Sequence, residues 1–509
     1  MHKLLKMLFF LAFVWIAITA ADECIPRDFG KGSIVCVCNS TYCDSTPETS
    51  SEPGTFLWYV SSNAGQRMEL TTGKIGHTEE GSTILTLNPE KRYQAIQGFG
   101  GAFTDSAAIN IKSLSDATQQ KLLETYFTRE GSRYNLGRIP IGGTDFSTRF
   151  YTYDDIENDI LLKKFSLAPE DTDYKIPLIQ SALQMNPDLR FFSAAWTAPM
   201  WMKTNNNSFG FGFLKKEYYQ LYADYLLRFL DEYKKQGIDM WAISTGNEPS
   251  NAYVPIVTIN NMGWTAGTVA TWVAENLGPS LDNSQHNQTL ILGLDDQRFN
   301  LPWFIDLVFR NKVAEKYISG VAIHWYWDSL IPAVVLDKTH NHFPKKFLLM
   351  TEACEGSLPW QLQKVILGSW ERAESTALKM FENMNHWVTG WVDWNLALDK
   401  VGGPNWNENN VDAPIIVDPE TDEFFKQPMY YAIHHFSRFL PRGSVRLELE
   451  DSSIIFRSLT SIAFETPENK TVVLIYNRSS ISKKVDIVDP RNGVINLELP
   501  ALSMNTILY

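Results

Sequence analysis

Two glutamates follow short apolar runs of the kind that form buried strands. Glu248 closes the segment Trp-Ala-Ile-Ser-Thr-Gly-Asn-Glu, and Glu352 closes Phe-Leu-Leu-Met-Thr-Glu. One carboxyl group at each of two strand ends can supply a proton donor and a nucleophile, the two groups that retaining glycoside hydrolysis requires. That chemistry needs the carboxyl groups about 5 Å apart, which two strands of one barrel can provide.

We assign the acid/base role to Glu248 and the nucleophile role to Glu352. Pro249 follows Glu248 and interrupts strand pairing, so the carboxyl group is expected at the end of its strand. The alternative for Glu248 is a carboxylate at a helix start. Asn247 is expected to hydrogen-bond the sugar 2-hydroxyl, with a turn residue as the alternative.

Four further side chains lie at or near the ends of other apolar runs and suit a sugar site. Trp196 and Trp394 could stack on the flat faces of a pyranose. Asp145 could bind sugar hydroxyls, and Arg138 could hold a carboxylate such as Glu352 in its charged form. A structural ion pair is the alternative for Arg138.

The elements that must position these residues are eight apolar runs separated by helix-length amphipathic stretches. Continuous apolar runs are typical of strands buried on both faces, and eight of them alternating with helices predict a (β/α)₈ barrel. The runs are Ala95–Ala102, Tyr134–Ile141, Leu189–Trp196, Met240–Thr245, Leu290–Leu294, Gly320–Trp325, Phe347–Thr351 and Val388–Trp394. Their ends lead into polar and aromatic residues, which should gather at one rim of the barrel.

The rest of the chain predicts further elements. Ser45–Gly54 has the composition of a linker, and Phe424–Leu440 is predicted to be helical. After it, short segments alternate polar and apolar residues, which indicates a small β-sandwich completed by Phe56–Leu87.

Composition narrows the class of protein. The chain has 509 residues, enough for two or three domains, and residues 1–21 have the layout of a cleaved secretory signal peptide. The net charge of −13 argues against a nucleic-acid partner. It suits a protein that works in acid, although ordinary solubility explains it equally well.

Cysteines and sequons fit the secretory route. Four cysteines crowd the N-terminal region and favour two disulfides, with three possible pairings, which leaves Cys354 free. The four are Cys24, Cys36, Cys38 and Cys43. Glycosylation is predicted at the sequons Asn39, Asn206, Asn287, Asn469 and Asn477.

No motif in the sequence demands a cofactor or a metal. The segment Gly98-Phe-Gly-Gly-Ala-Phe lacks the third glycine of a dinucleotide-binding loop. His340 and His342 have no third ligand at a metal-binding spacing. We therefore expect neither a cofactor nor a metal.

Several motifs together resemble the glucosylceramidases, lysosomal acid β-glucosidases of glycoside hydrolase family thirty. The similarity extends from the N-terminal cysteines to Tyr509. The motifs are Cys36-Val-Cys-Asn-Ser-Thr-Tyr-Cys43, Gln97-Gly-Phe-Gly-Gly-Ala, Trp196-Thr-Ala-Pro-Met-Trp, Asn247-Glu-Pro-Ser, His324-Trp-Tyr and Trp391-Val-Asp-Trp-Asn-Leu-Ala-Leu. The resemblance implies hydrolysis of glucosylceramide to glucose and ceramide in the lysosome, with a saposin-type activator and an anionic lipid surface as partners. Secretion is the alternative to delivery to the lysosome.

The resemblance also implies a domain layout after the signal peptide and a pairing of Cys24 with Cys36 and Cys38 with Cys43. It places a small antiparallel β-sheet domain at 22–48 and 397–427, an immunoglobulin-like sandwich at 49–93 and 442–509, and the catalytic barrel at 94–396 and 428–441.

Carried over residue by residue, the family pattern supports the two glutamate roles. It matches Asp145, Trp196, Asn247, Trp394 and Asn409 to glucose contacts and Tyr326 to a tyrosine beside the nucleophile. His324 is a supporting residue, like Arg138. Two features depart from the pattern: Gly246 replaces a glutamate, and the loop Asn251–Met262 differs.

Two other functions compete with this one. The first is a family-thirty hydrolase that acts on a different β-glucoside or glycan, and the apolar character of the loops around Trp327 and Asn407 should discriminate it. The second is a noncatalytic glycolipid carrier, which would need neither glutamate.

Overall fold

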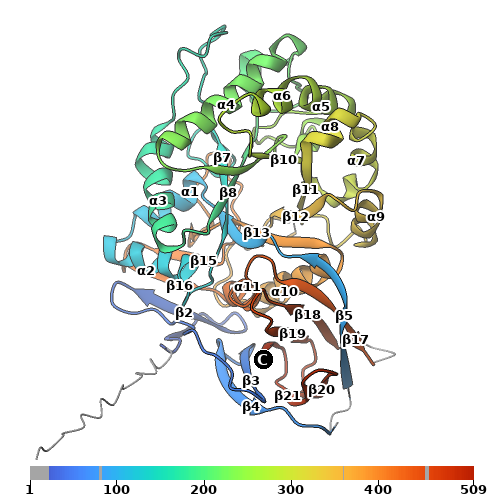
Figure 1. Cartoon of the computed structure of the whole chain (residues 1–509). Coiled ribbons are helices and arrows are strands. Elements are labelled where there is room, and N and C mark those ends of the chain that lie inside the picture. Colours follow the sequence, from blue (N-terminus) through green and yellow to red (C-terminus); the bar gives the residue numbers. More distant parts are fainter. Residues whose placement is uncertain (1–21, 79–82, 359, 453–457) are drawn as a thin grey trace, which may run out of the picture.

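The computed structural model describes residues 22–78, 83–358, 360–452 and 458–509, so the predicted signal peptide lies outside the described residues. The strands form a closed barrel, a five-stranded sheet and a nine-stranded sheet (Figure 1). No helix in the described ranges is both long enough and apolar enough to cross a bilayer.

All eight predicted strands exist, and they close into one parallel barrel. The fifth was predicted to end at Leu294, but its strand continues to Gln297, which brings two aspartates into the barrel wall. The barrel strands are β6 (Gly98–Ala102), β7 (Leu136–Ile141), β8 (Arg190–Ala195), β9 (Met240–Ser244), β10 (Leu290–Gln297), β11 (Ile318–His324), β12 (Phe347–Glu352) and β13 (Val388–Asn395).

Helices surround the barrel (Figure 1). Several begin at hydroxyl side chains that accept a backbone N–H, as Thr104 does from Ala107 and Ser369 from Arg372. They are α1 (Asp105–Lys112), α2 (Asp116–Phe127), α3 (Ile176–Met185), α4 (Tyr219–Lys235), α5 (Ala266–Trp272), α6 (Gly278–Asp282), α7 (Trp303–Val308), α8 (Lys312–Tyr317), α9 (Val334–His342), α10 (Trp370–Asn385) and α11 (Pro428–Ser437).

A layer of apolar side chains, one from each of seven barrel strands, forms a separate buried cluster. Its members are Leu136, Phe192, Ala242, Leu292, Ala322, Leu349 and Val392. Residues two apart in a strand share a face, so Leu136 lies on the face of Arg138, Ala322 on that of His324 and Val392 on that of Trp394. The layer therefore supports the site residues that follow it along the strands.

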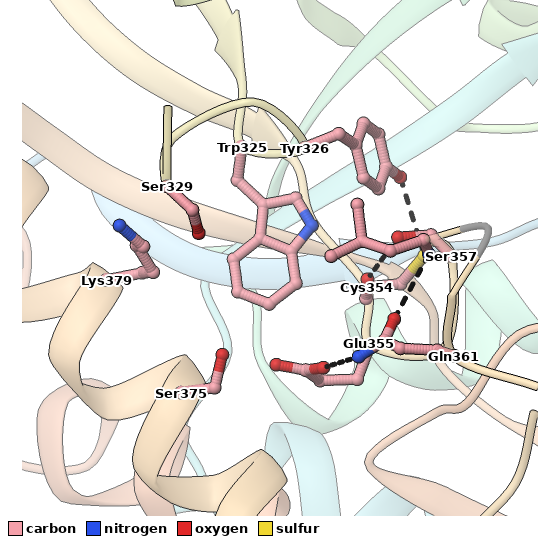
Figure 2. A pocket seen from close by; sticks show the side chains of 10 residues that line it. Trp325, Tyr326, Ser329, Cys354, Glu355, Ser357, Gln361, Ser375 and Lys379 are labelled. Carbon is pink, nitrogen blue, oxygen red and sulfur yellow. Dashed lines mark hydrogen bonds between the residues drawn. The ribbon is translucent and has the colours of Figure 1, made fainter. Parts of the chain in front are cut away.

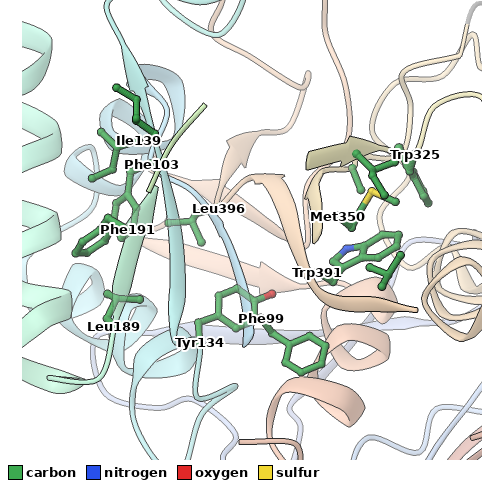
Figure 3. Close-up of a cluster of buried hydrophobic side chains, with 14 of the residues drawn as sticks. Phe99, Phe103, Tyr134, Ile139, Leu189, Phe191, Trp325, Met350, Trp391 and Leu396 are labelled. Carbon is green, nitrogen blue, oxygen red and sulfur yellow. The ribbon is translucent and has the colours of Figure 1, made fainter. Parts of the chain in front are cut away.

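A larger cluster fills the space between the barrel strands and the helices. Figure 3 shows part of it, with Phe103, Phe191 and Ile139 on one side and Met350, Trp391 and Trp325 on the other. This packing fixes the strands and with them the positions of their ends.

Two of the four N-terminal cysteines, Cys36 and Cys38, lie in a strand of the five-stranded sheet, and the other two are bonded to them. Cys24 is bonded to Cys36 and Cys38 to Cys43, which confirms the pairing that the family resemblance implied, and Cys354 is free and buried. The strands, in order across the sheet, are β1 (Pro26–Asp28), β2 (Ile34–Asn39), β16 (Glu423–Lys426), β15 (Ile415–Asp418) and β14 (Leu398–Asp399).

The nine-stranded sheet joins segments from both ends of the chain around one apolar core. Its strands, in order, are β21 (Gly493–Leu499), β20 (Lys483–Asp489), β5 (Thr83–Ala95), β17 (Val445–Asp451), β18 (Leu459–Glu465), β19 (Thr471–Asn477), β22 (Ser503–Leu508), β3 (Thr55–Ser62) and β4 (Glu69–Lys74).

The prediction of a helix over Phe424–Leu440 was wrong at its start. Residues 423–426 form strand β16, and the helix begins at Pro428, a residue that suits the first helical position. Every residue of α11 is buried, because the helix packs against β6 of the barrel and β22 of the nine-stranded sheet.

Candidate active site

Glu248 lies in a tight turn after strand β9. The backbone N–H of Asn247 donates to the carbonyl of Ala195 at 2.9 Å, and that of Glu248 donates to the carbonyl of Asp295 at 2.9 Å. Glu248 has a φ of 41°, a left-handed conformation that costs energy in most residues and is common at functional sites. A one-turn 3₁₀ helix, η4 (Pro249–Tyr253), begins directly after it.

Glu352 is the last residue of β12, and its carboxylate faces Glu248 across the rim of the barrel. An oxygen of each carboxylate and a ring nitrogen of His324 all lie within 4.8 Å of one another. This separation is close to the ~5 Å of enzymes in which the second carboxylate attacks the sugar directly.

Arg138 on β7 organises the charged side of the site. Its guanidinium is fully buried and donates to Glu352, to Asn247 Oδ1 at 2.7 Å and to Asp295 Oδ2 at 3.1 Å. Burial alone would lower the pKa of Arg138, but Asp295 and Glu352 reverse that effect and raise it. The guanidinium therefore fixes the position of the Glu352 carboxylate through a charged hydrogen bond.

His324 connects the two glutamates to Asp295. Its Nδ1 lies 2.8 Å from Glu248 Oε1 and its Nε2 lies 3.1 Å from Asp295 Oδ1. Burial would lower the pKa of His324, yet the charge of Glu352 and the bonds to Asp295 and Glu248 raise it to about 10. The imidazole is thus held in its cationic form, and its Nδ1–H donates to Glu248 Oε1.

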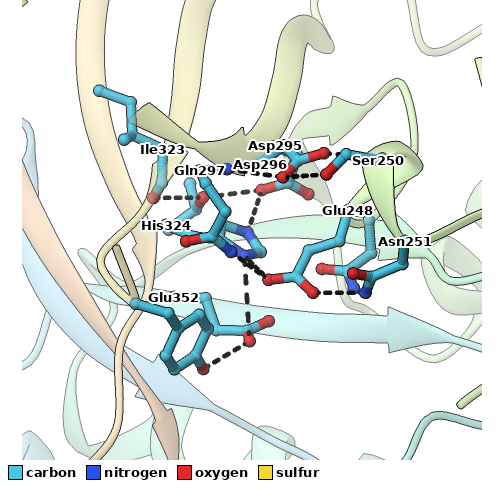
Figure 4. Close-up of polar contacts among 12 residues, drawn as sticks. Glu248, Ser250, Asn251, Asp295, Asp296, Gln297, Ile323, His324 and Glu352 are labelled. Carbon is cyan, nitrogen blue, oxygen red and sulfur yellow. Dashed lines mark hydrogen bonds and ion pairs between the residues drawn. The ribbon is translucent and has the colours of Figure 1, made fainter. Parts of the chain in front are cut away.

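Two residues that sequence reasoning did not assign to the site hold the Glu248 carboxylate (Figure 4). Gln297 Nε2 donates to Oε1 at 2.6 Å, and Asn251 Nδ2 donates to Oε2 at 2.7 Å. Asp295 was also missed as a site residue. The three polar residues Asp295-Asp296-Gln297 at the end of a strand could have indicated a site. The residues that they contact lie on other strands, so the sequence did not show which groups they bind.

Tyr326 lies on the other side of the nucleophile. Its hydroxyl donates to Glu352 Oε1 at 2.7 Å and lies 3.5 Å from Cys354 Sγ. Behind Tyr326 is a cavity of about 50 Å³ between Cys354, Glu355 and Trp325 (Figure 2). Burial raises the pKa of both the Cys354 thiol and the Glu355 carboxyl, which disfavours their charged forms.

Asp145 and Asn409 meet at the cleft although they are 264 positions apart. Asn409 Nδ2 donates to Asp145 Oδ2 at 2.8 Å. Burial, together with the charge of Glu352, raises the pKa of Asp145 to about 7. Asp145 is therefore a neutral group in acid, able to donate as well as accept a hydrogen bond.

The two tryptophans occupy different positions. Trp394 lines the cleft, whereas Trp196 stacks on it with ring centroids 5.2 Å apart. The Arg138 guanidinium lies over both rings, 5.0 Å from Trp196 and 5.3 Å from Trp394. Trp196 thus does not line the cleft but packs against Trp394 and Arg138 and holds them in position.

The cleft itself has a volume of about 510 Å³, with Glu248, Glu352 and Asp145 among its walls. Apolar side chains form much of its mouth. Ile256 is 88% exposed and Trp360 66% exposed, and Trp327 is also exposed. A large exposed apolar rim around a polar floor is typical of a site for a ligand with one apolar end.

The backbone conformation at position 246 explains why a glycine occupies it. Gly246 has a φ of 133°, which residues with a side chain rarely adopt. The chain therefore needs glycine where the family pattern has glutamate.

The site offers poor ligands for a metal. Both nitrogens of His324 already make hydrogen bonds, and the Arg138 cation lies against Glu352. The other described cluster of possible ligands contains Cys38 and Cys43, which are in a disulfide.

The predicted glycosylation sites differ in accessibility. Asn206, Asn287 and Asn469 are exposed, and Asn39 is half-buried. Asn477 is fully buried, and its Nδ2 donates to the carbonyls of Pro500 at 2.7 Å and Ile481 at 3.1 Å. A glycan on that nitrogen is incompatible with this fold, so the expectation for Asn477 is corrected.

The barrel and its pair of close carboxylates define a class, the glycoside hydrolases. The chain belongs to glycosyl hydrolase family 30: the model of the family's TIM-barrel domain matches residues 96–440, and that of its β-sandwich domain matches residues 443–507.

Individual relatives agree with this assignment. Lysosomal acid glucosylceramidase of Mus musculus is 43% identical over 100% of this chain and 99% of its own length. An endo-1,6-β-D-glucanase of Trichoderma harzianum is 27% identical over 75% of this chain and 78% of its own. Among solved structures, SrfJ from Salmonella typhimurium superposes with a TM-score of 0.82 at 28% identity, covering 89% of this chain and 99% of SrfJ.

Proposed function

We propose that this enzyme hydrolyses the β-glucosidic bond of glucosylceramide to glucose and ceramide, with retention of configuration through a covalent glucosyl-enzyme. The observation that carries the mechanism is the closeness of Glu248 and Glu352, whose oxygens lie within 4.8 Å of each other. The relative named as a glucosylceramidase, similar along the whole chain, supports the substrate.

In the first step Glu352 Oε attacks the anomeric carbon while the protonated carboxyl of Glu248 donates its proton to the departing glycosidic oxygen. Arg138 and Tyr326 both donate to Glu352, so they hold the attacking carboxylate in place. In the second step Glu248 takes a proton from water, and the water oxygen displaces Glu352 with a second inversion.

The remaining site residues are proposed to bind the sugar. Asp145 and Asn409, joined by their hydrogen bond, present polar groups at the cleft wall, and Trp394 presents an aromatic face. Arg138 fixes the amide of Asn247 for the sugar 2-hydroxyl.

The lipid part of the substrate is supported by the mouth of the cleft. Exposed Ile256, Trp327 and Trp360 offer apolar surface next to the position where the aglycone must leave Glu248. A glycan of linked sugars would gain little from Ile256. The endo-1,6-β-D-glucanase relative nevertheless makes a β-glycan the second candidate substrate.

We further propose that the enzyme works in the lysosome after passage through the secretory route, on an anionic lipid surface and with a saposin-type activator. The two disulfides and the neutral form of Asp145 in acid support this setting.

The test compares glucosylceramide in anionic vesicles with β-1,6-glucan, both at acidic pH. Release of ceramide and β-glucose, seen first as the β-anomer by NMR, is the expected result. A 2-deoxy-2-fluoroglucosyl fluoride should add one sugar mass to the peptide that contains Glu352. Cleavage of the glucan alone would remove the lipid substrate, and turnover of neither would favour a carrier.

A further inference from the structure

A second cavity, of about 640 Å³, lies on the other side of the η4 segment from the catalytic cleft. Pro249, Ser250 and Tyr253 of η4 line this cavity, whereas Asn251 of the same segment lines the cleft. The proposed reaction uses none of the cavity's interior.

The walls of this cavity are mainly apolar. Trp264, Leu294 and Phe304 are buried in them, while Trp303 is 50% exposed and Leu307 36% exposed. The volume lies within the ~300–1,000 Å³ of cavities that hold small ligands. Helices α5 and α7, which pack against each other, supply much of the lining.

Small residues keep the α5 side open. A Cβ added to Gly267 would meet only Thr265 Oγ1, at 4.0 Å. On the α7 side, Trp303, Leu307 and Arg310 are four and three positions apart, so they follow one face of the helix and the turn after it. An apolar passage thus leads to a cation at its mouth.

The polar groups of this cavity are unequally satisfied. Both oxygens of Asp296 accept hydrogen bonds, from Ser250 and from the backbone of Gln297. Trp264 Nε1 is buried without a hydrogen-bond partner among the described residues. Arg310 is exposed and forms no ion pair with any described residue. Asp296 is buried in the wall, so Arg310 carries the solvent-exposed charge of the lining.

We propose that this cavity binds a single-chain anionic amphiphile, such as a fatty acid, with its aliphatic chain between α5 and α7 and its anionic headgroup on Arg310. The chain would cover the apolar walls from water, and the headgroup would stay at the solvent edge, where Arg310 can bind it through two N–H groups. The site goes beyond the proposed hydrolysis and does not depend on it.

The test is quenching of tryptophan fluorescence by 9,10-dibromostearate below its micelle concentration, because bromine quenches only at contact and Trp303 and Trp264 line the cavity. We expect saturable quenching at micromolar concentration. Its amplitude should fall in Trp303→Phe. The neutral alcohol of the same brominated chain should bind about ten-fold more weakly, as expected from loss of a charged hydrogen bond.

Matched variants assign the two halves of the ligand. Arg310→Gln should weaken dibromostearate binding about ten-fold, and Arg310→Lys should largely retain it. Leu307→Glu, at a position that is partly exposed and tolerates charge, should remove the saturable phase. Arg129 is exposed and does not line this cavity, so Arg129→Gln serves as the control.

The proposal fails if quenching does not saturate, or if Leu307→Glu and Arg310→Gln bind like the native chain. Equal binding of the acid and the alcohol would overturn the role of Arg310. Circular dichroism and the Tm of each variant show whether it is folded, so loss of binding in a folded variant is decisive.

Discussion

Each of the two glutamates proposed to be catalytic is held by hydrogen bonds from neighbouring side chains. Glu352 receives hydrogen bonds from Arg138 and Tyr326, while Glu248 receives them from Gln297 and Asn251. The two carboxylates therefore differ in environment, since only Glu352 has a guanidinium against it.

Glu248→Gln should separate the two halves of the reaction. Substrates with poor leaving groups should lose a factor of about 10²–10⁴ in kcat, since they need the proton, whereas a dinitrophenyl glucoside should still form the glucosyl-enzyme. Added azide should speed turnover of that glucoside and yield β-glucosyl azide, measured by NMR. Glu408→Gln, a carboxyl on the same cleft, is the control. Equal losses on both substrates would contradict the acid role.

Asp145→Asn should change the dependence of stability on pH. The ordinary pKa of an aspartate, which applies in the unfolded chain, is 3.8, and burial raises the pKa of Asp145 to about 7 in the folded chain. Between these values the folded chain keeps a proton that the unfolded chain releases, so this group's contribution to stability falls as pH rises from about 4 to 7. Asp145→Asn should therefore raise the Tm at pH 7 and change it little at pH 4. The same small difference at both pH values would contradict the shift.

At the scale of elements, β6 shows how closely the barrel strands approach. Gly100 lies beside β7, and a Cβ built on it would lie 1.8 Å from the carbonyl oxygen of Leu136. The glycine is thus needed for strand pairing, and the glycine-rich segment serves close backbone packing.

Gly100→Ala should destabilise the barrel by about 3 kcal/mol or fail to fold, because backbone cannot move away as a side chain can. Thermal unfolding and soluble yield measure the effect. Gly267→Ala is the matched control, since open space surrounds that glycine. An unchanged Tm in Gly100→Ala would show that β6 and β7 are farther apart than described.

At the scale of the molecule, α11 joins the barrel to the nine-stranded sheet. His435 on this helix is fully buried, with Nδ1 2.8 Å from Thr506 Oγ1 and Nε2 2.9 Å from Ser61 Oγ. Its two partners come from β22 and β3, so one neutral imidazole connects both ends of the chain. Burial lowers the pKa of His435 to about 3.

His435→Gln should reduce the loss of stability in acid. The unfolded chain binds a proton at His435 below its ordinary pKa of 6.5 and the folded chain only near 3, so stability falls as pH drops between these values. The variant should lose about 1–2 kcal/mol at pH 7 from broken hydrogen bonds but show a smaller further drop at pH 4.5. Urea unfolding at both pH values measures this, with exposed His77→Gln as the control. An unaltered pH slope would contradict the burial of a neutral His435.

The sequence by itself determined the barrel and its pair of glutamates. Eight buried strands leave a periodic apolar signal, and parallel strands end at one rim, so Glu248 and Glu352 had to lie close together. The sequence pattern did not locate the start of the helix in Phe424–Leu440. An apolar strand and an apolar helix follow each other there, and only Pro428 marks the boundary between them.

Only the tertiary structure decided which groups surround the glutamates. Arg138 and Glu352 are 214 positions apart, and Asn409 reaches Asp145 from the segment between β14 and β15 of the five-stranded sheet. The roles of Asp295, Gln297 and Asn251, the burial of Asn477 and the second cavity likewise depend on contacts between distant segments. Such contacts leave no period or spacing in a single chain, because they arise when strands and helices pack, and packing is set by the whole molecule.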